Sequence, residues 1–154
     1  MNINLKTIRT TTTNPDFISL VSLLDQHLIG RYGDVQHQYD EYNNVEELKT
    51  ALVVYDNNKA VGCGCFKQKN TCTIEIKRMF VRDDFRGKGI AKMILNGLEQ
   101  WGLELGFTVS ILETGTKQFE AIALYASCGY HKIENYGQYI GMETSECYKK
   151  IIVD

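Results

Sequence analysis

Residues 51–112 place strand-like and helix-like runs in an order that few folds can accommodate. Three apolar runs separated by short polar breaks come first, a long amphipathic run follows, and another apolar run closes the segment. The runs occupy 51–55, 60–66, 71–81, 88–105 and 107–112. Short polar breaks join antiparallel neighbours, whereas a strand–helix–strand unit crosses over to make parallel strands. The order therefore predicts one sheet that mixes both kinds of pairing.

The flanking sequence adds strands and helices on both sides of this segment. Residues 3–9 alternate apolar and polar side chains, and Asn14-Pro15 opens a helical pattern over 15–30. A shorter helix is expected around 119–125, with two last strands at 130–134 and 146–153. A length of 154 residues is typical of one domain, so we expect a single domain over 1–154. The fold class is α/β of the mixed α+β kind, with about six to seven strands in the order β-α-(α)-β-β-β-α-β-α-β-β.

Composition excludes several classes of protein. The chain is 44% hydrophobic and 23% charged, which is ordinary for a globular domain, and its net charge of −2 argues against a generic nucleic-acid binder. No apolar run reaches the length of a membrane helix, and the polar N-terminus does not match a secretory signal. Five cysteines without such a signal indicate reduced thiols, so we expect a cytoplasmic protein with no membrane partner.

The cysteines also raise the question of a metal site. Cys63 and Cys65 could face one way on a strand and join Cys72 as ligands. The chain has no CxxC pair and only three histidines, and free cysteine is a common core residue. We therefore expect no metal.

The junction at residues 81–92 carries the clearest chemical signal. A strand ends there, a charged loop follows, and Gly87 and Gly89 open the long helix. A helix N-terminus offers unpaired N–H groups and the positive end of the helix dipole, so it binds anions. The glycines allow close approach of an anion to the backbone, and Arg86, Lys88 and Lys92 add positive charge. The pattern predicts a pyrophosphate site, and it matches neither the Walker nor the Rossmann glycine motif.

Three segments together resemble the GNAT superfamily of acetyl-CoA-dependent N-acetyltransferases. Residues 86–91 (Arg-Gly-Lys-Gly-Ile-Ala) are similar to its Q/R-x-x-G-x-G/A signature, and 75–81 to its central strand. Residues 118–130 are similar to its second motif, N-x-x-A-x-x-L-Y-x-x-x-G-F. Gln118 replaces the usual Asn and Ala91 the commoner Gly. The resemblance spans about residues 50–150 and implies the fold, acetyl-CoA as co-substrate, and transfer of acetyl to a primary amine.

The resemblance also implies roles for particular residues. Glu75, on the central strand, is the candidate base that takes the proton of the amine. Backbone N–H groups near Met79–Val81 would stabilise the oxyanion and pair with the pantetheine arm. Tyr125 would give a proton to the leaving thiolate. An acyl-enzyme on Cys128 is an alternative, but the motif holds no histidine to activate that thiol. The expected cofactor-binding residues are Met79, Phe80, Val81, Arg86, Gly87, Lys88, Gly89, Ile90, Ala91, Lys92, Gln118 and Tyr125.

The sequence constrains the identity of the acyl acceptor less than it constrains the cofactor. Residues 34–47 hold five carboxylates, no Lys or Arg, and interleaved aromatic side chains, in a region that borders the acceptor cleft of similar proteins. A cationic small amine is therefore favoured, although a solvated loop explains the same composition. Three alternatives stay open: a protein or peptide acetyltransferase, a non-enzymatic acetyl-CoA sensor, and an unrelated nucleotide-binding module. The family resemblance also makes a homodimer a reasonable expectation.

Overall fold

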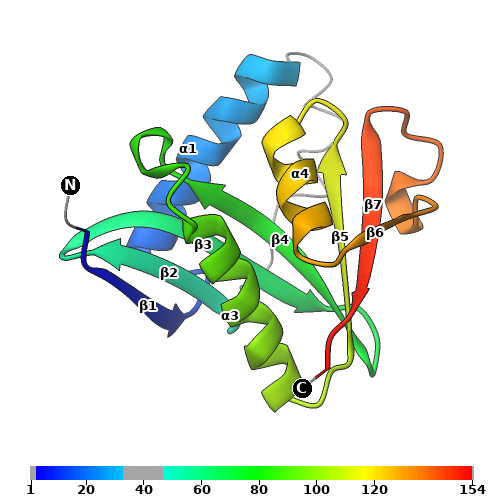
Figure 1. The fold of residues 1–154 in the computed structure, drawn as a ribbon, viewed down its shortest axis with the longest axis horizontal. Coiled ribbons are helices and arrows are strands. Elements are labelled where there is room, and N and C mark those ends of the chain that lie inside the picture. Colours follow the sequence, from blue (N-terminus) through cyan, green and yellow to red (C-terminus); the bar gives the residue numbers. More distant parts are fainter. Residues whose placement is uncertain (1–2, 33–46, 154) are drawn as a thin grey trace.

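The computed structural model describes residues 3–32 and 47–153. In that part of the chain, a seven-stranded sheet has helices on both faces (Figure 1). The elements are β1 (Leu5–Thr10), α1 (Pro15–Tyr32), β2 (Ala51–Asp56), β3 (Lys59–Gln68), β4 (Thr73–Val81), α3 (Ile90–Glu104), β5 (Val109–Gly115), α4 (Phe119–Ser127), β6 (His131–Ile133) and β7 (Ser145–Ile151).

The sheet mixes antiparallel and parallel pairing, as the order of the elements predicts. Its strand order is β1-β2-β3-β4-β5-β7-β6, and β4 and β5 are its parallel pair. Helix α3 connects these two strands, which is the crossover that a parallel pair requires. Both edges of the sheet are antiparallel. The mixed α/β fold with about seven strands is thus confirmed.

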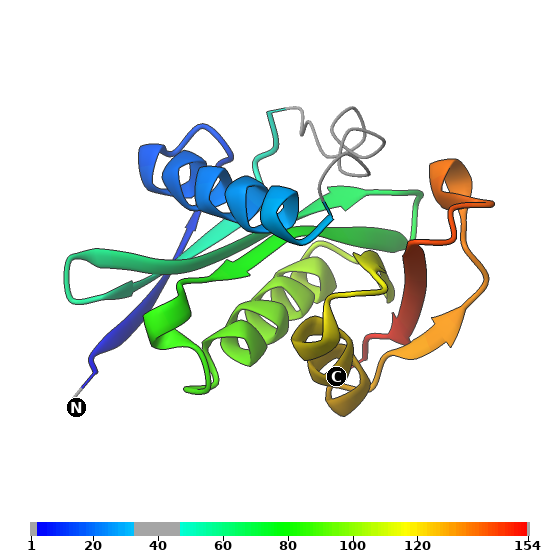
Figure 2. The ribbon, with the colours of Figure 1, turned by 90° about the horizontal axis from the view of Figure 1, so that it is seen from above.

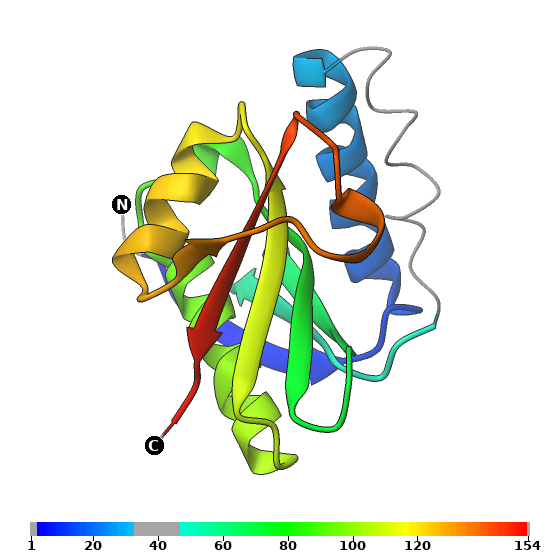
Figure 3. The same ribbon diagram turned by 90° about the vertical axis from the view of Figure 1, so that its right-hand side faces the viewer.

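Helix α3 is amphipathic, and its apolar stripe fills one face of the sheet. Ile90, Ile94, Leu95 and Leu98 are buried there, at the helical spacing visible in the sequence. Burial of each such side chain contributes about 1.5–3 kcal/mol. Helix α4 covers the same face farther along, whereas α1 lies on the opposite face (Figures 2 and 3).

Helix α1 begins as the sequence indicates and ends later. The side chain of Asn14 accepts hydrogen bonds from the backbone N–H groups of Asp16 (2.8 Å) and Phe17 (3.2 Å), which caps the first turn. The expected end at Gly30 is wrong, because the helix continues to Tyr32. Arg31 in the last turn donates to the carbonyl oxygen of Lys117 at 2.5 Å, a long-range contact that holds this turn in place.

Strands β4 and β5 pair over only part of their length. The register joins Thr73–Ile76 to Val109–Leu112, after which β4 continues to Val81 and β5 to Gly115. Past this point β4 remains bound to β3 and β5 to β7, so the two strands diverge within one continuous sheet. The prediction that the fifth strand stops at residue 112 is therefore wrong by three residues.

A bulge in β4 lies where the divergence begins. Arg78 has a φ of 58°, and the register with β3 shifts between Cys63 and Cys65. A bulge adds a residue to one strand and changes the direction in which later side chains point. As a result, Arg78 reaches Asp25 on α1, with 2.6 Å between Nη2 and Oδ1.

The remaining predicted boundaries agree with the structure to within a few residues. The long helix begins at Ile90 rather than at residue 88, because Gly89 is its N-cap. Such shifts are normal at element ends. Within residues 3–32 and 47–153, no helix is long and apolar enough to cross a membrane.

Candidate active site

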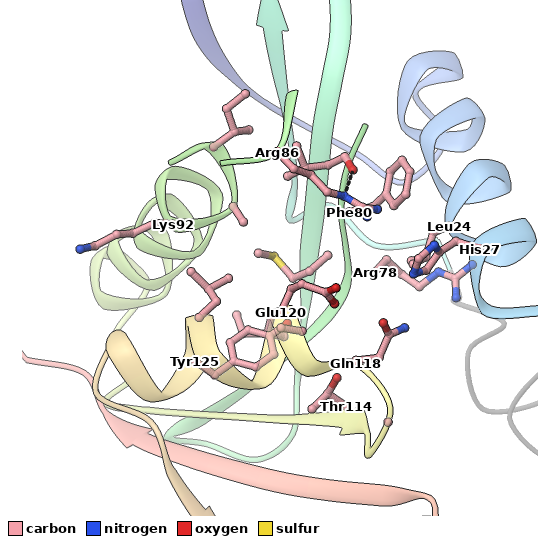
Figure 4. A pocket seen from close by; sticks show the side chains of 18 of the residues that line it. Leu24, His27, Arg78, Phe80, Arg86, Lys92, Thr114, Gln118, Glu120 and Tyr125 are labelled. Atoms are coloured by element: carbon pink, nitrogen blue, oxygen red, sulfur yellow. Dashed lines mark hydrogen bonds between the residues drawn. The ribbon is translucent and has the colours of Figure 1, made fainter. Parts of the chain in front are cut away.

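A cleft of about 630 Å³ opens where β4 and β5 diverge. Its walls come from the second half of β4, the end of β5, the first turn of α3, helix α4 and the last turns of α1. Figure 4 shows it with α1 on one side and α3 and α4 on the other. Its volume is in the range of small-molecule sites.

The glycine loop forms one end of this cleft. Gly87 and Gly89 have φ values of 77° and 80°, a left-handed conformation that favours glycine. A methyl group added at either would meet no atom within 4 Å, so the backbone there is open to a ligand. The first turn of α3 has no acidic residue, and its leading N–H groups lack partners within the helix. The arrangement suits an anion such as a pyrophosphate.

The three cationic side chains predicted at the glycine loop differ in their position relative to the cleft. Arg86 lines the cleft, where it donates to the carbonyl oxygen of Val81 at 3.1 Å (Figure 4) and pairs with Asp83 at 3.0 Å. Lys92 also lines the cleft, although the end of its side chain points away from the other labelled groups in Figure 4. Lys88 is exposed and is not among the lining residues. The backbone is therefore the better-placed anion donor.

The central strand contributes its diverging segment. Met79, Phe80 and Val81 all line the cleft, beyond the last described pairing of β4 with β5. Backbone groups on the β5 side of this segment are thus available to an extended ligand. This is the geometry expected of a binding edge for the amide-rich pantetheine arm.

Tyr125, from α4, lies deep in the same cleft. Its ring packs edge-on against Tyr130, with 5.9 Å between the ring centroids, and it is 6% exposed. Figure 4 shows its side chain directed into the cleft. Burial, followed by the nearby charges of Glu113 and Cys128, raises the pKa of its phenol well above the usual 10. The phenol therefore keeps its proton and acts as a hydrogen-bond donor.

Gln118 is the N-cap residue of α4, and it lines the cleft. Its side-chain oxygen accepts a hydrogen bond from Arg31 Nη1 at 3.3 Å. The amide that replaces the family's usual Asn thus ties the end of α1 to the loop before α4.

The predicted base, Glu75, is not among the residues that line the cleft. It is 4% exposed, and one carboxylate oxygen accepts a hydrogen bond from the hydroxyl group of Tyr136 at 2.7 Å. Ile74 and Ile76 face the opposite side and pack into the core under α3, as strand alternation predicts. The role of Glu75 remains a prediction.

Several lining residues escaped the sequence analysis. Leu24 and His27 come from α1, Arg78 from the bulge, and Glu113 from the C-terminal part of β5. The only sequence signal for Glu113 is an acidic residue directly after the predicted strand 107–112. Their approach depends on how α1 and β5 pack, which local patterns do not encode.

Three of the five cysteines are buried in the core. All five are free, with Cys63, Cys65 and Cys147 buried. Burial raises the pKa of the Cys63 and Cys65 thiols, the latter to about 12. Within the described ranges, no group of three or more His, Cys, Asp or Glu side chains could hold a metal ion.

Comparison with known proteins identifies the family. The sequence model of the acetyltransferase (GNAT) family matches residues 17–130. The chain belongs to the GNAT family. Among GNAT relatives, the IAA acetyltransferase of Azospirillum brasilense is 31% identical over 130 residues, 79% of this chain and 81% of that protein. Probable N-acetyltransferase 14 of Xenopus tropicalis is 27% identical over 90% of this chain, which spans 66% of that protein's length.

Solved structures of the GNAT fold agree with this assignment. The PaiA N-acetyltransferase of Thermoplasma acidophilum, in complex with coenzyme A, has a TM-score of 0.72 at 14% identity. The match covers 97% of this chain and 99% of that one. The resemblance drawn from the three sequence segments is therefore confirmed.

The phosphate-loop assignment predicts a selective effect of Gly89→Ala. A side chain at positive φ costs about 1–2 kcal/mol of stability, and at Gly89 it would also crowd a bound pyrophosphate. We expect acetyl-CoA affinity, measured by calorimetry, to fall at least about tenfold.

Gly106→Ala is the matched control for this substitution. Gly106 has a φ of 96°, is equally open, and lies at the other end of α3. It should lose similar stability without losing affinity. Equal affinities of the two variants would refute the phosphate-loop assignment.

Proposed function

We propose that this protein is an acetyl-CoA-dependent N-acetyltransferase that acts on a small primary amine by direct attack in a ternary complex. The observation that carries the proposal is the continuity of the cleft, which joins the glycine loop of α3 to the gap between β4 and β5. Family membership supports the acetyltransferase class, and the PaiA neighbour was solved with coenzyme A.

The chain's own groups would hold acetyl-CoA at both ends of this cleft. Backbone N–H groups at Gly87, Gly89 and the first turn of α3 would bind the pyrophosphate, with Arg86 beside them. The open edge of Met79–Val81 would pair with the pantetheine amides and donate to the carbonyl oxygen as negative charge develops. Acetyl-CoA itself supplies the activated thioester.

Tyr125 is proposed to assist departure of the thiolate. Because the pKa of its phenol is raised above 10 and a thiol's is about 8.5, complete proton transfer to sulfur would be uphill. Donation of a hydrogen bond to the developing thiolate fits these values, with the final proton supplied as the product leaves. The acyl-cysteine alternative at Cys128 has no additional support.

The proposal includes a cytoplasmic location, no resident metal, and assembly as a homodimer. The five free cysteines support a reducing compartment. The presence of a lined cleft with a buried phenol and nearby carboxylates supports an enzyme over a sensor, which needs no acid or base.

A panel of amines with acetyl-CoA, followed by release of free thiol, tests the function directly. Steady turnover with any small amine supports the proposal. Turnover with peptides alone would favour a protein or peptide acetyltransferase. Acetyl-CoA binding without turnover would favour the sensor, and calorimetric preference for ATP or NAD would favour an unrelated nucleotide-binding module.

Replacement of Tyr125 by Phe tests the proposed thiolate donor. The ring and its packing remain, so acetyl-CoA affinity should change little. Loss of the hydroxyl should lower kcat by roughly 10²–10³, the usual cost of removing one hydrogen-bond donor to developing charge. A kcat within a few-fold of the wild type would make Tyr125 a packing residue.

The acceptor is proposed to be cationic. Residues 34–47 carry the acidic composition, and all of them except Glu47 lie outside the described residues. Steering by these carboxylates predicts a higher kcat/KM for a dicationic amine than for glutamate, with a preference that weakens as salt is added. Faster turnover of glutamate would contradict the cationic acceptor and leave the acetyltransferase function intact.

A further inference from the structure

Arg78 enters the cleft from the bulge in β4, on the side of α1. Its Nη2 lies 2.6 Å from Oδ1 of Asp25, a residue of α1, and its side chain is only 6% exposed. It is one of the residues that line the cleft, and Figure 4 shows it on the same side as Leu24 and His27. A largely buried guanidinium group thus forms part of the cleft wall on the α1 side.

The hydrogen bonds of this guanidinium group are incomplete. An arginine side chain has five N–H donors. Among the described residues, Arg78 donates one side-chain hydrogen bond, from Nη2 to Asp25, and its buried Nε has no acceptor. A buried polar group without a partner is rare and costs stability. A ligand that brings acceptor oxygens would supply what the chain itself does not.

The backbone also distinguishes this position. Arg78 has a φ of 58°, and in the described part of the chain Asn57 is the other non-glycine residue with a positive φ. Asn57 lies in the turn between β2 and β3, where asparagine tolerates that conformation. Glycine would adopt it at position 78 without strain, whereas arginine does so at a cost in stability. Strained residues of this kind cluster at binding and catalytic sites, which fits a side chain that is needed in the cleft.

The ion pair with Asp25 leaves Arg78 able to bind a second anion. The described contact joins one nitrogen to one oxygen, whereas an arginine can hold a carboxylate through two parallel hydrogen bonds. The side chain of Asp25 is 47% exposed and is therefore solvated by water on its outer side. Because Arg78 is buried and Asp25 is not, the guanidinium group has more to gain from a further anion than Asp25 has to lose.

The charges along the cleft favour an anionic ligand on β4 as well as at the glycine loop. Besides His27, the ionisable acidic and basic residues of the described lining are Lys77, Arg78, Arg86, Lys92, Glu113 and Glu120. Four of these six are cations. Arg86 and Lys92 belong to the loop and to α3, where the pyrophosphate is proposed to bind. The other two cations are consecutive residues of β4, at the end of the cleft where the acceptor would meet the acetyl group.

We propose that Arg78 binds a carboxylate group of the acyl acceptor, so that the acceptor is an amino acid rather than a simple amine. This inference rests on the proposed acetyltransferase function and narrows its substrate class. Arg78 directly precedes Met79, whose backbone is proposed to hold the reacting end of acetyl-CoA, so a carboxylate on Arg78 lies close to the acetyl group. An α-amino acid, which carries its amine next to its carboxylate, fits this proximity. A basic side chain on that amino acid agrees with the cationic acceptor proposed above.

The first test compares amino acids with their carboxamides in the thiol-release assay with acetyl-CoA. Lysine and lysinamide, and then phenylalanine and phenylalaninamide, differ within each pair only in the carboxylate. We expect kcat/KM for the amino acid to exceed that for its amide by about 10–100-fold, the usual effect of hydrogen bonds to a charged group. Lysinamide carries the larger positive charge, so attraction by acidic residues alone would give the opposite order.

Three variants make this result specific to Arg78. Arg78→Gln removes the guanidinium group and should abolish the preference, with kcat/KM lowered about 10–100-fold for the amino acid and within a few-fold for the amide. Asp25→Asn breaks the same ion pair but leaves the guanidinium group, so the preference should be kept or increase. Arg82→Gln is the charge-matched control: Arg82 follows β4 directly, donates to the carbonyl oxygen of Ala60 at 2.7 Å, and does not line the cleft. It should keep the preference.

The second test needs no turnover. Calorimetry measures the binding of the amino acid to the protein saturated with coenzyme A, which has no acetyl group to transfer. Arg78→Gln should raise the Kd of the amino acid about 10–100-fold and leave the affinity for coenzyme A unchanged. Arg78→Lys serves as a second variant if the glutamine variant does not fold. It keeps a positive charge beside Asp25 but loses the planar pair of donors, so it should lose most of the preference for the carboxylate.

The outcomes separate this inference from the proposed function. A wild type that releases no thiol with any amine would refute the function, and the binding comparison would then decide by itself whether Arg78 holds a carboxylate. An active wild type that uses the amides as well as the amino acids, or better, overturns the inference alone. A preference that survives in Arg78→Gln does the same, as does an equal loss in Arg78→Gln and Asp25→Asn, which would make the ion pair structural. Loss of coenzyme A affinity in Arg78→Gln would assign Arg78 to the cofactor instead.

Discussion

The early end of pairing between β4 and β5 is the constraint on which the rest of this structure depends. Both strands continue past Ile76 and Leu112, but each stays bound to its other neighbour, β3 or β7. The bulge at Arg78 helps turn β4 away without breaking its ladder with β3. A gap opens inside an otherwise continuous sheet, and its backbone groups are left for a ligand. The cleft thus exists because β4 and β5 are paired with each other over only part of their length.

Helix α3 connects this gap to the anion-binding loop. The side chains that bury its apolar stripe also fix the helix axis, so its N-terminus is aimed by the packing of the core. Gly87 and Gly89 bring the chain from β4 into that helix through left-handed turns that leave the backbone open. The stability of the fold and the position of the glycine loop therefore depend on the same strand–loop–helix unit.

The sheet also divides the chemistry between its two faces. Tyr125 reaches the cleft with α4, on the face where α3 presents its loop, and Glu113 faces α1. Burial raises the pKa of both groups, but with opposite consequences: the phenol stays a donor at any ordinary pH, while the carboxyl titrates near 7. The two faces of the sheet thus bring a proton donor and a titrating carboxyl to one cleft.

The sequence by itself determined the order of elements, the mixed sheet, the glycine loop at a helix start and the GNAT family, because periodicity, turn residues and short motifs are local properties. Tertiary structure decided that Glu113 lines the cleft and that Glu75 does not. Residues 113–115 look like a polar loop in sequence, yet pairing with β7 extends β5 through them and orients Glu113. Conversely, Glu75 lies on the expected strand, but Tyr136, 61 positions away, engages it. Such contacts join distant segments, so no local pattern contains them.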